Sequence, residues 1–198
     1  MRRFAESRDL LHSDKDAISY YTEATISLKK HGLEKYFSKE SQASNEGVQF
    51  PEPVRDRIVT LVLKGAKAQK LGIELRFKDR FTIEIYDSNG KQVTTDDFVL
   101  LSKTIAHLAE LDLSQSNTER AMLLGAANLA LGIQLSAFEV DFLRMYGIGC
   151  KFSGLQTLEK CTKNTNNKEM MKEIREMRSE LERQFQRLKN APPTMPYY

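Results

Sequence analysis

The stretch IELRFKDRFTIEIYDSNGKQV, residues 73–93, alternates apolar and polar side chains one by one. The apolar positions are Ile73, Leu75, Phe77, Phe81, Ile83 and Ile85. A period of two is typical of a β-hairpin with one buried face and one solvated face. Asn89–Gly90 is a strong turn signal and predicts a third short strand at about 91–94. The stretch therefore predicts a small antiparallel sheet, a hairpin or meander over about 73–94.

On both sides of this stretch, apolar residues recur with the helical period, and they predict helices at about 14–30, 53–71, 96–111, 117–133, 137–146, 154–161 and 167–189. Residues that can cap a helix, three positions before an acidic or amide side chain, are Ser13, Ser116, Ser136, Ser153 and Asn166. Glycines that can end a helix are Gly32, Gly72 and Gly147. The predicted class is α+β and mostly α, with the sheet packed on a helical bundle and a long C-terminal helix.

Polar residues without periodicity at 38–50 predict a linker between the first helix and the rest of the chain. The last residues, APPTMPYY, are rich in proline and predict a flexible tail. The expected organisation is an N-terminal helical arm (1–37), the linker (38–50), a globular α+β core (51–163), a C-terminal amphipathic helix (164–190) and the tail (191–198).

The composition bounds the class of protein. The chain has 198 residues, of which 40% are hydrophobic and 29% charged, so it has enough apolar material for a packed core. A net charge of +3 permits a polyanionic partner without requiring one. Cys150 and Cys161 form no disulfide framework, and no apolar run approaches the roughly 18 residues of a membrane span. With no export signal at the N-terminus, we expect a cytoplasmic protein that does not enter the membrane.

Basic residues gather between residues 64 and 80, where they outnumber acids. They are Lys64, Lys67, Lys70, Arg76, Lys78 and Arg80. If the helix and the hairpin pack side by side, these cations form one patch that can neutralise phosphates and bind nucleic acid. The alternative is an ordinary solvated face, because Tyr86 is the only aromatic residue on the outward side and single-strand binders use stacking rings.

Residues 129–148, LALGIQLSAFEVDFLRMYGI, have the spacing of a helix-turn-helix with Gly132 in the turn. The second helix would present Glu139 and Asp141 to DNA, so two antiparallel core helices explain the segment better. Together with LAELDLSQSNTERAMLLGAANLALGI before it, the segment resembles the helical modules of the TerB type, with Asp112 and Glu119 as the matching carboxylates. Leu113 stands where those modules have glycine, so we assign no family and predict no metal role.

The string GIGCKFSG, residues 147–154, has the composition of an anion-binding or catalytic loop before a helix. It lacks the spacing of a phosphate-binding loop, and the three histidines that could activate Cys150 are distant in sequence. Glycines that end a helix beside a buried thiol are the simpler interpretation. We therefore predict no catalytic residue, no metal ligand and no cofactor.

The last predicted helix has an apolar seam with heptad spacing, and its members are Met170, Ile174, Met177, Leu181, Phe185 and Leu188. The charges around the seam are of both signs, and they include a run of glutamates that would repel phosphate. A packing surface therefore explains this helix better than a nucleic-acid contact. The seam would bind a second copy of the chain, with a dimer favoured, a partner helix, or the protein's own core.

Three functional classes follow from these patterns. The first is a non-enzymatic adaptor or regulatory protein that self-associates or docks a partner through the C-terminal helix. The alternative is a nucleic-acid-binding accessory protein that uses the basic surface at 64–80. An enzyme comes third, because no nucleophile, base and oxyanion donor can be grouped from the sequence.

Overall fold

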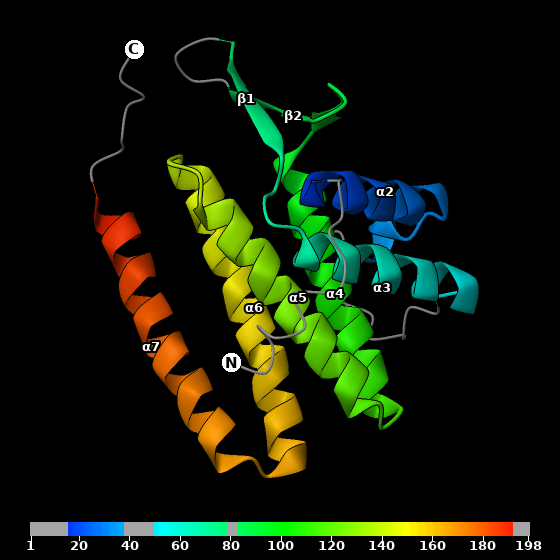
Figure 1. The fold of residues 1–198 in the computed structure, drawn as a ribbon, viewed down its shortest axis with the longest axis vertical. Helices are drawn as coiled ribbons and strands as arrows, with labels where there is room; N and C mark the ends of the chain where they lie inside the picture. Colours follow the sequence, from blue (N-terminus) through cyan, green and yellow to red (C-terminus); the bar gives the residue numbers. More distant parts are fainter. Residues whose placement is uncertain (1–15, 38–49, 79–82, 192–198) are drawn as a thin grey trace.

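The computed structural model describes residues 16–37, 50–78 and 83–191 (Figure 1). Its elements are α2 (Ala17–Lys30), the short 3-10 helix η2 (Glu34–Phe37), α3 (Glu52–Lys67), β1 (Ile73–Phe77), β2 (Ile83–Asp87), β3 (Gln92–Val93), α4 (Thr95–Ser114), α5 (Thr118–Ser136), α6 (Asp141–Thr165) and α7 (Lys168–Asn190). The predicted class, mostly helical α+β, is confirmed. Nearly all of the predicted linker (38–50) and tail (191–198) lies outside the described residues, as does Arg80.

The four helices α4 to α7 run side by side, and α2 and α3 lie across them (Figure 1). The sheet caps one end of this arrangement. The main core lies where α2 and α3 meet α4 and α5, and its largest fully buried side chains include Tyr21, Ile58, Phe98, Leu101, Ile105 and Leu131. α2 belongs to this core through Ala17, Ile18, Tyr21, Ala24 and Leu28.

The sheet has three antiparallel strands in the order β1-β2-β3, with Leu75 opposite Ile85 and Ile85 opposite Val93. The predicted antiparallel sheet and its third strand are confirmed, and Ile85 and Val93 are buried in the main core. Phe81 and the Phe77 side chain, which belong to the predicted alternation, lie outside what the structure describes. The turn between β2 and β3 contains Gly90 at φ +74°. The buried Asp87 side chain fixes the turn by accepting hydrogen bonds from two backbone amides.

A capping box starts α4 directly after the sheet. The Thr94 hydroxyl accepts a hydrogen bond from the Asp97 amide, and the Asp97 carboxylate accepts one from the Thr94 amide. Lys29 of α2 also donates to Asp97, at 2.6 Å. Burial by itself would raise the pKa of Asp97, but the hydrogen bonds from Lys29 and Thr94 hold it below its ordinary value. The cap therefore joins α2 to the start of α4.

The largest departure from the sequence-based expectation is α6. The glycine pattern predicted two helices, 137–146 and 154–161, with Gly147 as a stop and Ser153 as a cap, whereas the chain forms one helix from Asp141 to Thr165. The string GIGCKFSG lies inside this helix, so its amides serve the helix and are not arranged to receive an anion. Likewise α5 continues through Gly132 to Ser136, and the turn follows at 137–140.

Glycines sit inside these helices because α5 and α6 pack against each other backbone to backbone. A Cβ atom added to Gly132 would stand 2.5 Å from the carbonyl oxygen of Gly147, and one added to Gly147 would stand 2.6 Å from that of Gly132. Two turns further along, a Cβ atom on Gly154 would stand 2.7 Å from the carbonyl oxygen of Gly125. This tertiary contact outweighs the weak helix propensity of glycine, about 1 kcal/mol per residue.

A buried polar cluster fixes the register of three helices. The Asn128 amide of α5, which is fully buried, donates to the Ser102 carbonyl of α4 at 3.2 Å and to the Ser153 hydroxyl of α6 at 3.0 Å. The Ser102 hydroxyl donates back to the Asn128 side-chain oxygen at 2.9 Å. Since a buried polar group without partners is costly, these bonds favour one relative placement of α4, α5 and α6.

The glycine contact predicts opposite effects for two neighbouring substitutions in α6. Gly147→Ala should lower the free energy of unfolding by about 1–3 kcal/mol, because its methyl group meets the α5 backbone. Gly149→Ala, at an exposed position where nothing lies within 4 Å of the new atom, should raise it by up to about 1 kcal/mol. Urea denaturation followed by circular dichroism measures both; the same sign for the two variants would contradict close backbone packing of α5 on α6.

Candidate functional site

The C-terminal helix α7 runs alongside α6 (Figure 1). It begins where the Asn167 side chain accepts a hydrogen bond from the Met170 amide at 3.0 Å. Of the predicted seam, Ile174 and Leu181 are buried, with 1% and 4% of their surface exposed. Met170, Met177, Phe185 and Leu188 are partly buried beside them. The seam thus lies against the protein's own body, which is one of the three positions that the sequence left open.

The apolar contacts of α7 form a cluster of their own. Ile174 and Leu181 pack with Ile148, Leu155 and Leu158 of α6, and α7 contributes no side chain to the main core. The connection from α6 to α7 consists of Asn166 and Asn167, and Asn166 has a left-handed backbone with φ 51°. α7 is therefore attached to the rest of the molecule by one small cluster and one short turn.

Charged side chains add little to this attachment. Arg178 of α7 reaches Glu159 of α6 at 3.1 Å, and Lys163 reaches the same carboxylate at 3.0 Å. The Lys163 hydrogen bond and the positive charges around it lower the pKa of Glu159. The other ion pairs of α7 join residues within the helix, namely Lys172–Glu176, Arg178–Glu182 and Arg183–Glu180. Exposed pairs of this kind contribute about 0–1 kcal/mol each.

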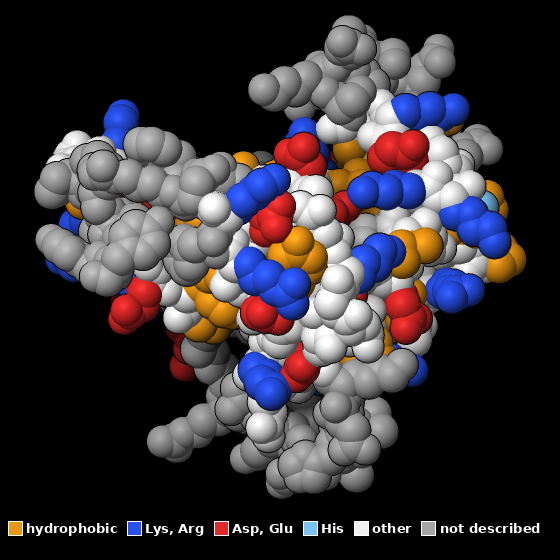
Figure 2. Space-filling model, turned by 90° about the horizontal axis from the view of Figure 1, so that it is seen from above, with side chains coloured by type: hydrophobic (Ala, Val, Ile, Leu, Met, Phe, Trp, Pro, Cys, Tyr) orange, Lys and Arg blue, Asp and Glu red, His pale blue; other side chains and the backbone are white. Residues whose placement is uncertain are grey.

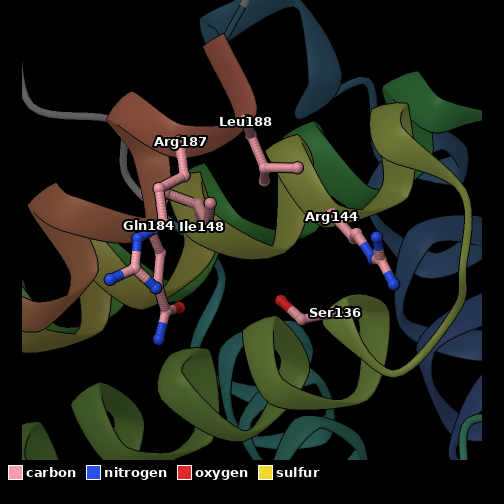
Figure 3. A pocket seen from close by; sticks show the side chains of 6 residues that line it. All are labelled: Ser136, Arg144, Ile148, Gln184, Arg187 and Leu188. Carbon is pink, nitrogen blue, oxygen red and sulfur yellow. The ribbon is translucent and has the colours of Figure 1, made fainter. Parts of the chain in front are cut away.

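A cavity of about 220 Å³ opens where α7 ends beside the turn between α5 and α6. It is lined by Ser136 of α5, by Arg144 and Ile148 of α6, and by Gln184, Arg187 and Leu188 of α7. Ile148 and Leu188 are its apolar lining residues, the other four are polar or charged, and the cavity is open to solvent. In Figure 3, Leu188 and Ser136 point toward each other across the space, and the two arginines lie on opposite sides of it.

Of the six basic residues predicted to bind nucleic acid, three are paired with acids and Arg80 lies outside the described residues. Arg76 donates to Glu74 at 2.8 Å and lies over the Tyr86 ring, 4.2 Å from its centre. Lys78 lies 3.9 Å from Glu84, and Lys70 lies 3.6 Å from Asp16. Lys64 and Lys67 are exposed on α3. Seen from the end that carries the sheet, Lys and Arg side chains are interspersed with Asp and Glu (Figure 2). Nucleic-acid binding by this surface stays a sequence-based prediction.

Other candidate groups have structural partners. Asp112 is buried and accepts a hydrogen bond from Arg120 at 2.7 Å, so this carboxylate joins the end of α4 to the start of α5. Cys150 and Cys161 are free thiols buried inside α6. Burial raises the pKa of Cys150 to about 11, although a hydrogen bond with Ser102 acts in the opposite direction. Both thiols are therefore protonated at neutral pH.

Across residues 16–37, 50–78 and 83–191, no group of three or more histidine, cysteine, aspartate or glutamate side chains is arranged to hold a metal ion. None of the helices in the same ranges has the length and apolar character needed to cross a membrane. Comparison with known proteins adds no assignment, because no family model, no curated protein and no solved structure matches the chain.

The raised pKa predicts an unreactive Cys150. At pH 8, about one thiol in a thousand is ionised when the pKa is about 11. Alkylation of the folded protein by iodoacetamide should therefore be at least about 100-fold slower than alkylation in urea, as followed by intact mass. Rapid labelling of the folded protein, assigned to Cys150 rather than Cys161 by peptide mapping, would show that Cys150 is an accessible thiolate and would support the enzyme hypothesis.

Proposed function

We propose that this protein is a non-enzymatic interaction protein whose α7 exchanges between its own body and that of a second copy. The observation that carries the proposal is the separate packing of α7, whose apolar cluster has only Met122 of α5 in common with the main core. A helix that is removed from its own α6 exposes the seam, and leaves a complementary surface on α5 and α6 free to receive another copy of α7.

Exchange reuses contacts that exist within one chain. In a swapped dimer, Ile174 and Leu181 of each copy meet Ile148, Leu155 and Leu158 of the other, so no new surface has to be complementary. Met170 and Met177 in the seam, and Met122 of α5 beside it, are flexible side chains that adapt to small differences in packing. The second copy is therefore the partner that this surface fits best.

The turn between α6 and α7 favours exchange. An L-residue in the left-handed region is disfavoured by about 1–2 kcal/mol, and asparagine reduces this cost without removing it. Asn166 would leave that region if α6 and α7 joined into one continuous helix, a geometry in which α7 cannot return to its own α6. Short, strained connections of this kind promote domain swapping.

Two variants of the turn should move the equilibrium in opposite directions. Asn166→Gly removes the backbone strain and should keep the chain monomeric. The double variant Asn166→Ala/Asn167→Ala removes the cap of α7, which is worth about 1 kcal/mol, and favours a continuous helix. Its dimer should form at roughly tenfold lower concentration than that of the unmodified chain. Light scattering after size-exclusion chromatography measures the mass; identical masses for all three proteins at every concentration would exclude exchange through α7.

A cross-linking experiment separates exchange from other modes of association. Glu159 and Arg178 face each other across α6 and α7. A chain with Glu159→Cys, mixed with a chain with Arg178→Cys, should give a heterodimer with a short bismaleimide linker. The double variant on one chain provides the positive control. Dimers that form without this cross-link would indicate a different interface.

Leu181→Glu tests whether α7 is separable from the core. A carboxylate at this buried position should release α7 and abolish dimers, while α2 to α6 keep their packing because Leu181 lies outside the main core. Circular dichroism should lose the signal of about one helix, and the cooperative unfolding of the remainder should persist. Leu181→Met, a swap that costs less than about 1.5 kcal/mol, is the control. Complete unfolding of the glutamate variant would contradict the separation.

A further inference from the structure

The geometry points to a binding site, in the cavity at the end of α7, for a small monocarboxylate with an apolar body about the size of one aromatic ring. The site does not rest on exchange of α7, because the same six side chains surround the cavity whichever copy supplies the helix. Ile148 and Leu188 offer contacts for the apolar body, and Arg144 and Arg187 offer positive charge for the carboxylate.

The size and the lining of the cavity define the apolar part of the ligand. An apolar cavity of about 150 Å³ in a protein is large enough to bind benzene. The volume of about 220 Å³ between Ile148 and Leu188 accommodates a single ring or a short acyl chain. The cavity is open to solvent, so a ligand can enter it without a change in the fold.

The cations at the rim define the charge. Within the part of the chain that the structure describes, the Arg187 guanidinium has no hydrogen bond and no carboxylate partner. It lies on the side of the cavity where Gln184 stands (Figure 3). A guanidinium presents paired N–H donors that match the two oxygens of a carboxylate. Arg187 is therefore the principal partner for the anion.

A second cation, Arg144 on α6, adds to the positive field. It donates to the Phe138 carbonyl at 3.1 Å through Nε, which holds its guanidinium at the opposite rim, and its guanidinium lies 3.9 Å from the Asp141 carboxylate. Lys151 does not line the cavity, because its side chain lies beside Gly132 of α5. The positive charge of the site therefore comes from Arg187 and Arg144.

The acids near the rim select against a doubly charged ligand. Asp141 stands beside Arg144, and Glu180 accepts a hydrogen bond from Gln184 at 3.3 Å. Each of these carboxylates repels a dianionic ligand more strongly than a monoanionic one. The Ser136 hydroxyl donates to the Gly132 carbonyl at 2.8 Å, so it adds no donor for a phosphate. The balance of groups favours a monoanion with an apolar body over inorganic phosphate.

The test is a titration of the full chain with benzoate, followed by amide NMR shifts. Benzoate should produce saturable shifts at residues 144–148 and 184–188. Benzamide, which has the same shape without the charge, should bind at least about tenfold more weakly, and inorganic phosphate should not saturate these amides. Absence of saturable shifts with benzoate, or equal binding of benzamide, would overturn the proposal.

Variants locate the site. Arg187→Gln should weaken benzoate binding by about tenfold or more, since it removes the charge and keeps a long polar side chain. Arg183→Gln, one turn earlier on α7 and already paired with Glu180, should leave the affinity unchanged. Leu188→Trp should fill the cavity and abolish binding, and circular dichroism confirms that each variant is folded. Equal affinities for Arg187→Gln and Arg183→Gln would show that benzoate binds elsewhere.

Discussion

The close approach of α5 and α6 is the constraint on which the rest of the structure depends. Gly125 and Gly132 on α5 face Gly154 and Gly147 on α6, and the two pairs lie two helical turns apart. Because no side-chain layer separates the helices at these points, their neighbouring faces join into one continuous surface. α7 packs on that surface, and the cavity lies where α5 has ended and α7 continues beyond it.

The close packing also explains which interactions are rigid and which are separable. Asn128, whose side chain is fully buried, links α4, α5 and α6 through hydrogen bonds, and the main core extends from these helices to α2, α3 and the sheet. α7 takes part in neither arrangement. A helix that adds one small cluster to a complete body is suited to reversible contact, because its release leaves the body's own packing intact.

Local patterns in the sequence predicted the elements whose signals are local. The alternation at 73–93 and the Asn89–Gly90 turn predicted the sheet, and the heptad seam predicted α7 and its buried face. The prediction of two helices in place of α6 was wrong, because glycine occurs both where a helix ends and where two helices pack closely, and the sequence does not distinguish the two. Asn166 was predicted as the cap of α7, whereas the cap is Asn167 and Asn166 takes the left-handed turn before it. The pairing of Lys70 with Asp16 and the cavity depend on residues far apart in sequence, so neither could be predicted. The pairing of Arg76 with Glu74, two residues away, is local and could have been expected.

If α7 is held on a rigid body as a separable unit, native-state hydrogen exchange of the full chain should measure this directly. In low concentrations of denaturant, the amides of α7 should exchange through local unfolding of α7, which should cost less free energy than the unfolding that exposes the amides of α5 and α6. All α7 amides should show the same free energy of opening, because the helix is released as a unit. Exchange of α7 at the same free energy as α5 and α6 would mean that the molecule opens as one cooperative unit, and this result would contradict a separable α7.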